Sequence, residues 1–460
     1  MLNKIKKIHF IGIGGIGMSG LAKVFFQLGY KISGSDKVEN FCVYKLREIG
    51  IEVFVGHKKT NIKEDVELVV YSSSIFPNNP EFIRAKELGI PILHRSDVLA
   101  FLFQTKIGIA VAGAHGKTTI SALLTHLLHE AGLSPTAIVG GWINQYDTNA
   151  WLGKGNIIIA ESDESDGSFI KLSPVYSVVN NIDFEHLDYY RNDINEIIRA
   201  YQLFINKTRD MGCVFYCYDD LYLREIMLNL PVRSISYGFS KDSDVYPLNI
   251  SLNANHVEFE CSYFGEKVEG FSLQIPGKHN VLNAQAVIAL AREFNIDWNV
   301  IKQALSSFKG TKRRFQIRKY EPIMIIDDYA HHPNEIKATL EAARTFKKNR
   351  IITVFQPHRY SRTFYLKDKF ADAFSLTDKL LLTDIYSASE KPIKGINGYM
   401  LHEEIVKKLG SNKEVLFFKK DKIASYLLDT LEKDDLVLML GAGDITEVTD
   451  ELLKGLEGKC

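Results

Sequence analysis

Two glycine-rich segments have the residue types and spacing that bind phosphate groups. Gly12, Gly14 and Gly17 form the pattern GxGxxG near the start of the chain, and the second segment reads GAHGKTT over residues 113–119. Glycines let the backbone approach a phosphate closely, and the N-terminus of a following helix attracts its negative charge. The sequence therefore predicts two separate sites for phosphorylated ligands.

The first segment fits a dinucleotide and a sugar nucleotide equally well. Asp36 follows at the end of KISGSD, about 20 residues after the glycines, where an acidic side chain can bind a ribose hydroxyl. The same geometry holds NAD or the diphosphate of a UDP-sugar, and both stay open on the residues of the loop. A purely structural role, as a tight turn between a strand and a helix, is also open.

The second segment predicts a site for a nucleoside triphosphate and a metal ion. The apolar run KIGIAVAG precedes it and a helical segment beginning TTISALL follows, as a phosphate-binding loop requires. Val111 stands where the usual spacing has a glycine, so the loop is a shortened variant. Lys117 can reach the terminal phosphoryl oxygens, and the Thr118 hydroxyl can bind Mg²⁺.

Further metal ligands are expected after the neighbouring strands. Glu161 ends the run NIIIAE, where its carboxylate would point toward the 113–119 loop, and His186 lies in NIDFEHLD. Histidine is an uncommon ligand for a hard ion, so residue type alone favours a structural role for His186. The later residues of ESDESD are equally well explained as a solvated loop.

The elements that must position these residues are parallel sheets with crossover helices. Short β-branched runs recur along the chain, most of them followed by amphipathic segments, and ligands in such sheets bind beyond the carboxyl ends of the strands. The runs are KIHFIG, KIGIAVAG, NIIIAE, YSVVNN, IMIIDD, RIITVFQ, DKLLLTD and DLVLMLG.

The length of 460 residues predicts an α/β protein of three domains. We expect a Rossmann-like domain over residues 1–105 and a central parallel sheet of the P-loop ATPase type over residues 106–311. A second Rossmann-like domain is expected over residues 312–460. Alternating segments between about Leu230 and Gln274 predict an antiparallel, strand-rich insertion in the central domain.

Composition excludes several classes of function. The 56 basic residues equal the 56 acidic residues in number, which argues against a general attraction to nucleic acid or to anionic membranes. The five scattered cysteines predict neither a disulfide framework nor a zinc site, which favours a reducing, cytoplasmic compartment. We find no run of the ~20 apolar residues that cross a bilayer, and the glycine-rich start argues against a signal peptide.

The ordered motifs resemble those of the ATP-dependent Mur ligases, and the resemblance runs through the whole chain. The motifs are GxxGKTT, ExDESD, NIxxxHxD, GKHNVxN, GTxRRF and DDYAHHP. The N-terminal segments GIGGIGMSGLA, SGSD, YSSSI and ILHRSDVLA are similar to the branch that attaches L-alanine to UDP-N-acetylmuramate. The resemblance thus implies a UDP-sugar at the first glycine loop, in place of a redox cofactor.

The resemblance also implies the reaction and its residues. The implied substrates are ATP, UDP-N-acetylmuramate and L-alanine, with an acyl phosphate as intermediate and two positions for Mg²⁺. The UDP-sugar would be bound by Gly14, Gly15, Ile16, Gly17, Asp36, Ser73 and Arg95. ATP would be bound by Gly113, Ala114, His115, Gly116, Lys117, Thr118, Thr119, Asn280, Asn283 and Arg314. The metal ligands would be Thr118, Glu161 and His186. The amino acid would be bound by Tyr329, His331, His358, Arg359 and Arg362. The implied catalytic residues are Lys117, His186, Arg314 and Asp328.

Several points stay open at this stage. Asp328 and His331 are both candidates for the base that deprotonates the amine. The chain has no lysine between Leu187 and Asn206, where some relatives carry a carbamylated lysine, so the ligands of the second metal are undefined. The alternatives are a sister ligase that attaches a recycled peptide to the same UDP-sugar and an NAD-dependent dehydrogenase. The oligomeric state is not predicted.

Overall fold

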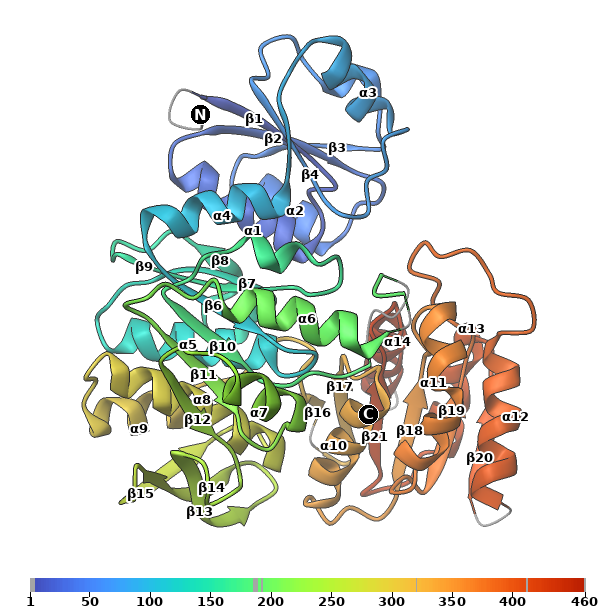
Figure 1. Ribbon diagram of the computed structural model, residues 1–460. Coiled ribbons are helices and arrows are strands. Elements are labelled where there is room, and N and C mark those ends of the chain that lie inside the picture. The colour runs from blue at the N-terminus through green and yellow to red at the C-terminus, as the bar shows by residue number, and fades with distance from the viewer. Residues whose placement is uncertain (1–4, 185–188, 192, 320, 411–412, 459–460) are drawn as a thin grey trace. The chain divides into compact units, whose positions relative to one another are not determined.

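The fold was analysed in a computed structural model that describes residues 5–184, 189–191, 193–319, 321–410 and 413–458 (Figure 1). The chain forms two compact units. The first contains residues 1–247, 261–268 and 282–305, and the second contains residues 248–260, 269–281 and 306–460.

The N-terminal part of the first unit is a five-stranded parallel sheet in the order β3-β2-β1-β4-β5. Its strands are β1 (Lys7–Ile11), β2 (Lys31–Asp36), β3 (Glu52–Val55), β4 (Leu68–Tyr71) and β5 (Ile92–His94). Its helices are α1 (Ile16–Gln27), α2 (Phe41–Glu48), α3 (Pro80–Glu87) and α4 (Arg95–Thr105), with a short η2 (Lys59–Asn61). Gly34 in β2 leaves room for Ile13, because a Cβ there would meet the Ile13 side chain at 2.5 Å. This close packing brings the first glycine loop against the sheet.

The central sheet has ten strands in the order β15-β14-β13-β12-β11-β10-β6-β9-β7-β8. The strands are β6 (Ile107–Ala112), β7 (Thr136–Ile143), β8 (Thr148–Trp151), β9 (Ile157–Glu161), β10 (Tyr176–Val179), β11 (Cys213–Cys217), β12 (Ser234–Tyr237), β13 (Val245–Leu252), β14 (Val257–Tyr263) and β15 (Glu266–Leu273). The helices are α5 (Lys117–Glu130), α6 (Ile194–Ile205), α7 (Leu221–Leu228), α8 (Lys278–Glu293) and α9 (Trp298–Ser307), with the short turns η3 (Asn144–Tyr146) and η4 (Ser168–Lys171). The strands β12 to β15 account for the strand-rich insertion that the sequence predicts, but β12 is parallel to both of its neighbours, β11 and β13, so the antiparallel expectation is wrong for this strand.

The C-terminal sheet has the order β16-β17-β21-β18-β19-β20, and all its pairs are parallel except that of the edge strand β16 with β17. The strands are β16 (Gln316–Lys319), β17 (Met324–Asp328), β18 (Ile351–Phe355), β19 (Lys379–Leu382), β20 (Glu414–Phe417) and β21 (Leu436–Leu440). The helices are α10 (Pro333–Arg344), α11 (Tyr360–Ala373), α12 (Gly398–Leu409), α13 (Lys420–Thr430) and α14 (Thr446–Glu457).

Helices cover both faces of the C-terminal sheet. One apolar core joins Ile326 of β17 to residues of α10, α11 and α12, and another joins Ile325 to residues of α13 and α14. Neighbouring residues of one strand point to opposite faces, so a run such as IMII can fill both cores. The three-domain α/β fold predicted from the sequence is confirmed.

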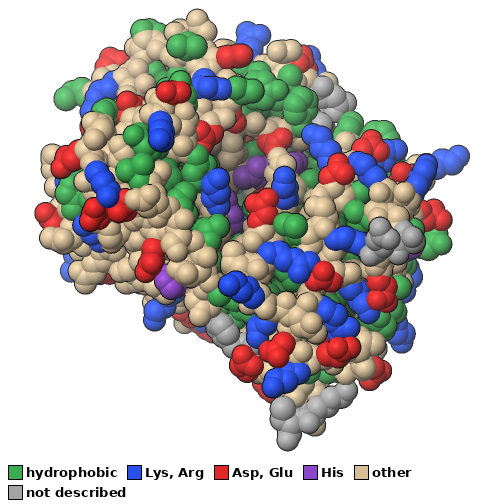
Figure 2. All heavy atoms as spheres, turned by 90° about the horizontal axis from the view of Figure 1, so that it is seen from below, with side chains coloured by type: hydrophobic (Ala, Val, Ile, Leu, Met, Phe, Trp, Pro, Cys, Tyr) green, Lys and Arg blue, Asp and Glu red, His purple; other side chains and the backbone are tan. Residues whose placement is uncertain are grey.

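The surface charge and the helices can be compared with what the sequence predicts. Figure 2 shows basic and acidic side chains interspersed over one face of the molecule, in keeping with their equal numbers. The helices within the described ranges include none with the length and apolar character to cross a membrane. The expected domain boundaries fall in the connections that precede β6 and β16 and stay a prediction.

Candidate active site

The 113–119 loop connects β6 to α5 and turns at two glycines. Gly113 and Gly116 have φ values of +132° and +84°, in the region that favours glycine. A Cβ at Gly116 would also collide with the side chains of Asn180 and Asn283. The backbone N–H of His115 donates to Asn181 Oδ1 at 2.7 Å. The loop is therefore anchored by the two asparagines that follow β10, and one of them, Asn180, also donates to Asn283 of α8.

Lys117 is the first residue of α5, and its ammonium group is paired with Glu164. Its Nζ lies 3.0 and 2.9 Å from the two carboxylate oxygens of Glu164, and it also donates to the carbonyl oxygens of Gly113 and Ala114. Burial disfavours the ammonium ion, but the charges of Glu164 and Asp163 outweigh this effect and raise the pKa of Lys117 above its usual value. Lys117 is therefore a fixed positive charge at the start of the helix.

Thr118 and Glu161 form an oxygen-rich group beside this lysine. The Thr118 hydroxyl donates to Glu161 Oε1 at 3.0 Å, and the carboxylate also accepts the backbone N–H of Gly140 in β7. Hydroxyl and carboxylate oxygens are the ligands that Mg²⁺ prefers. The two residues that the sequence offered as ligands of the first metal thus lie together and fit that ion. His186, the expected ligand of the second, lies outside the described residues.

Gly140 is a site residue that the sequence did not reveal. A Cβ at this position would overlap the Glu161 carboxylate. We expect Gly140→Ala to displace that carboxylate and to lower ATP-dependent turnover by about a hundredfold, because small misplacements of such groups cost that much. Steady-state phosphate release measures the effect. Gly458→Ala is the matched control, since its Cβ would make ordinary contacts near 3.8 Å, and equal activity of the two variants would contradict the expectation.

The first glycine loop lies between β1 and α1. Asp36 Oδ2 accepts the Gly14 N–H at 2.9 Å, and a Cβ at Gly14 would lie 2.8 Å from the same oxygen. Asp36 therefore braces the loop itself. Gly15 precedes α1 as its N-cap and Ile16 is its first residue. Gly17 is the second residue of α1, and a Cβ there would meet nothing within 4 Å, so the start of the helix can be approached closely.

Ser73 and Arg95 contact the acidic loop of residues 161–166. Arg95 Nη2 lies 3.1 Å from Asp163 Oδ2 and 3.5 Å from Asp166 Oδ2, and the Ser73 hydroxyl donates to Asp166. Glu164 is 3% exposed. The interpretation of the later ESDESD residues as a solvated loop is therefore wrong for Glu164. The side chains of this loop instead contact Ser73 and Arg95, which follow β4 and β5, and Lys117.

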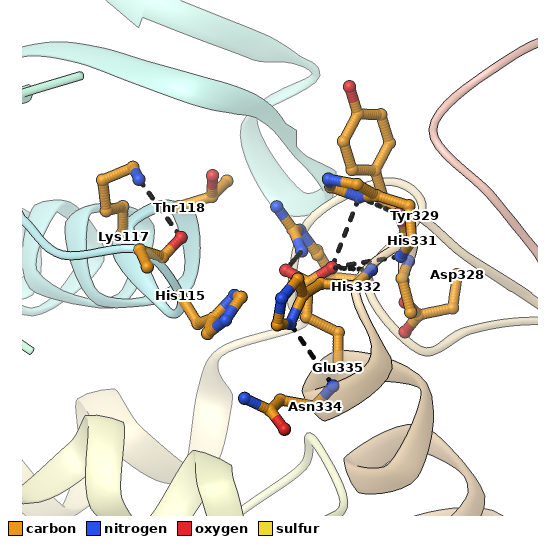
Figure 3. A network of polar contacts seen from close by, with 12 residues as sticks. His115, Lys117, Thr118, Asp328, Tyr329, His331, His332, Asn334 and Glu335 are labelled. Atoms are coloured by element: carbon orange, nitrogen blue, oxygen red, sulfur yellow. Dashed lines mark hydrogen bonds and ion pairs between the residues drawn. The ribbon is translucent and has the colours of Figure 1, made fainter. Parts of the chain in front are cut away.

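Asp328 is the last residue of β17, and His331 lies between β17 and α10 (Figure 3). Asp328 accepts the backbone N–H groups of Phe315 at 2.6 Å and of Ala330 at 2.7 Å. Burial raises the pKa of Asp328 to about 6, although the charge of Arg314 opposes the shift. Each carboxylate oxygen accepts one backbone N–H, so Asp328 shapes this turn, and its role as the base stays a prediction.

Glu335 in the first turn of α10 links two of the expected site residues. Its Oε2 lies 3.3 Å from His331 Nδ1, and its Oε1 lies 3.8 Å from Arg314 Nη1. The guanidinium of Arg314 also lies over the Tyr329 ring, 5.2 Å from its centre. Arg314, Tyr329 and His331 are thereby brought together. Asn280, in the first turn of α8, donates from Nδ2 to the carbonyl oxygen of Pro276 at 2.7 Å.

His358 and Arg359 lie between β18 and α11, and Arg362 lies in the first turn of α11. Arg362 Nη1 lies 3.0 Å from His358 Nδ1, and the His331 and His358 rings are 5.6 Å apart. Arg359 has a φ of +69°, which is rare for a residue other than glycine and is found where function over-determines the backbone. Its Nε is buried without a hydrogen-bond partner in the structure. The five residues expected at the amino acid thus follow two strands of one sheet, β17 and β18.

Comparison with known proteins agrees with this arrangement. Residues 7–106 match the description "Mur ligase family, catalytic domain", residues 111–291 match "Mur ligase middle domain" and residues 313–443 match "Mur ligase, glutamate ligase domain". The UDP-N-acetylmuramate--L-alanine ligase of Sulfurihydrogenibium sp. is 44% identical over 458 residues, which cover 99% of each chain. That of Carboxydothermus hydrogenoformans is 45% identical over 454 residues, covering 98% of this chain and 97% of the relative.

A solved structure has the same fold along the whole chain. The crystal structure of UDP-N-acetylmuramate-alanine ligase MurC from Thermotoga maritima has a TM-score of 0.84 and 31% identity, and the match covers 99% of this chain and 100% of that one. Fold and site define a multidomain α/β enzyme with a glycine-rich loop between a strand and a helix of its central domain. The chain belongs to the Mur ligase family, and it is a ligase. This membership argues against the NAD-dependent dehydrogenase.

Proposed function

We propose that the protein joins L-alanine to the lactyl carboxylate of UDP-N-acetylmuramate in an ATP-dependent reaction that releases ADP and phosphate. The observation that carries the proposal is the group formed by Lys117, Thr118 and Glu161 at the loop after β6. It suits a nucleoside triphosphate with Mg²⁺. The names of relatives that are 44% and 45% identical over nearly the whole chain support L-alanine and the UDP-sugar as substrates.

The chemistry begins with a carboxylate oxygen of the sugar attacking the γ-phosphorus of ATP, with ADP as the leaving group. The product is an acyl phosphate. The amine of L-alanine then adds to the acyl carbon, loses a proton, and the tetrahedral intermediate expels phosphate. The first step joins two anions, so positive charge must be held beside the transferring group.

The residues of this chain would divide that task. Lys117 holds its ammonium at the N-terminus of α5, where it can neutralise the terminal phosphates. Thr118 and Glu161 would hold Mg²⁺, which supplies further positive charge when bound. The first glycine loop, with Ser73 and Arg95, would take the UDP-sugar. Arg359 and Arg362 are suited to a free α-carboxylate, because a guanidinium can donate two parallel hydrogen bonds to it.

The test is phosphate release from ATP with UDP-N-acetylmuramate and a panel of amino acids and peptides. We expect release to require the UDP-sugar and to be greatest with L-alanine. Release without the UDP-sugar would contradict the proposal. A tripeptide that outperforms L-alanine would favour the sister ligase. Because ATP is a cytosolic metabolite, the cytoplasmic location expected from the sequence stays part of the proposal.

A further inference from the structure

The loop after β19 is attached to the start of α11, where two of the expected amino-acid-binding arginines lie. The N–H of Tyr386 donates to the Pro357 carbonyl oxygen at 2.9 Å, and the N–H of Arg359 donates to the Tyr386 carbonyl oxygen at 2.8 Å. The Tyr386 ring stacks on that of His358, with 5.7 Å between their centres. The sheet places β18 and β19 side by side and parallel, so residues after their carboxyl ends meet at one edge.

Glu390 is carried to Arg359 by this loop. Its Oε1 accepts the Ser361 hydroxyl at 2.7 Å, its Oε2 accepts the Ser361 N–H at 3.1 Å, and its Oε1 lies 4.0 Å from Arg359 Nη1. The side chains of Glu390 and Arg359 are 23% and 35% exposed, so both can reach a ligand. An acidic side chain at a helix N-terminus also interacts favourably with the helix dipole. The loop thus places a carboxylate beside a guanidinium.

The backbone around this pair is strained on both sides. Arg359 has a φ of +69°, and the two residues before Glu390, Ala388 and Ser389, have φ values of +47° and +70°. Three non-glycine residues in the left-handed region, on two connected segments, are costly and concentrate where side chains must be aimed at a ligand. Capping the N-terminus of α11 does not by itself require a strained loop, because a Ser, Thr, Asp or Asn at the N-cap position can accept the free backbone N–H groups.

We propose that Glu390 binds the α-ammonium group of the incoming amino acid while Arg359 and Arg362 bind its carboxylate. This inference rests on the proposed function. A free α-amino acid carries both charges at neutral pH, separated by one carbon atom, so its receptor needs a carboxylate a few ångströms from a guanidinium. The 4.0 Å between Glu390 and Arg359 supplies that complementarity. Glu390 thus determines specificity for an α-amino acid over a simple carboxylic acid.

The experiment compares wild-type enzyme with Glu390→Gln, using L-alanine as substrate and two half-analogues as inhibitors. Propionate keeps the carboxylate of L-alanine and lacks the amine, whereas ethylamine keeps the amine and lacks the carboxylate. In the variant we expect the KM for L-alanine to rise about tenfold or more, the usual loss for one charge-assisted hydrogen bond. Inhibition by ethylamine should weaken, and inhibition by propionate should stay the same or tighten because a negative charge near Arg359 is gone.

The KM values for ATP and UDP-N-acetylmuramate should change less than about twofold, since neither substrate would touch Glu390.

Two further variants test whether Glu390 binds the amine. Ser361→Ala removes one hydrogen bond to the Glu390 carboxylate without removing its charge, so the KM for L-alanine should rise by less than in Glu390→Gln. Glu390→Asp draws the charge back by one methylene and should give an intermediate KM, even if Glu390→Gln proves unstable. An unchanged KM for L-alanine, or an equal weakening of propionate and ethylamine, would overturn the amine assignment. The second result would mean that Glu390 only positions Arg359.

Failure of the proposed function would be seen separately. It is tested by the wild-type enzyme alone, through its choice of amino acid and its need for the UDP-sugar. The assignment of Glu390 is tested by the difference between variant and wild type with whichever amino acid the wild type accepts.

Discussion

Replacing Lys117 by alanine is expected to lower ATP-dependent phosphate release by about a hundredfold to a thousandfold, the usual effect of removing a group that stabilises charge in a transition state. Lys117 is 2.9 Å from Glu164 and at the start of α5, so its position is fixed before the nucleotide binds. The loss should appear mainly in kcat, because the interaction with the γ-phosphate strengthens as the phosphoryl group is transferred.

Lys171→Ala is the matched control. Lys171 lies in η4 of the same domain and pairs with Asp97 near the surface, with 43% of its side chain exposed. Its removal should leave kcat unchanged, as exposed ion pairs contribute little. If the Lys117→Ala variant retained activity within a few-fold of wild type, the assignment of the 113–119 loop as a phosphate-binding loop would be contradicted.

The largest expected effect on stability is that of Glu81→Ala. Glu81 is fully buried in α3, and its carboxylate accepts hydrogen bonds from Ser35 and Asn61, each at 2.5 Å, and lies 3.4 Å from His9 Nε2. Removing one member of a buried charged network leaves the others without compensation, at a cost of about 3 to 5 kcal/mol. Urea denaturation at pH 7, followed through the free energy of unfolding, measures it.

The same carboxylate predicts how acid affects stability. Burial alone would raise the pKa of Glu81, but hydrogen bonds from His57, His9 and Ser35 outweigh it and hold the pKa well below the usual 4.5. A carboxyl group with a lowered pKa stabilises the folded state above its unfolded pKa, and this contribution is lost as pH falls below about 4.5. Wild-type protein should therefore lose stability in that range, and Glu81→Gln should lose less.

Glu87→Ala separates this effect from any change of charge in α3. Glu87 lies in the last turn of the same helix and pairs with Lys59 at the surface. The variant should unfold at the wild-type urea concentration. If Glu81→Ala does the same, the buried network contributes nothing to stability.

Much of the fold could be predicted from local patterns. All eight β-branched runs recognised in the sequence are strands, namely β1, β6, β9, β10, β17, β18, β19 and β21. Buried parallel strands must be apolar on both faces, which makes such runs conspicuous. The strand β7 was not recognised, because two glycines, Gly140 and Gly141, interrupt the apolar pattern of its run TAIVGGWI. Gly140 leaves room for the Glu161 carboxylate at the end of β9, which only the tertiary structure reveals.

The candidate site was predicted less evenly. Lys117, Thr118 and Glu161 were found because each follows a strand that the sequence marks clearly. Glu390 was not, although it follows the recognised run DKLLLTD, because seven residues of loop separate it from the end of β19 at Leu382. The rule that ligands bind after strand ends could have directed attention to DIYSASE.

The sequence by itself determined the class of each domain and the two glycine loops, because spacing along the chain sets which residues share a turn or a strand end. Only the tertiary structure decided the partners of charged side chains. Glu164 pairs with Lys117 and Glu390 lies beside Arg359, although 47 and 31 positions separate them in the chain. Such pairs depend on which strands are neighbours in the sheet, and strand order follows from the packing of whole crossover units rather than from any local pattern.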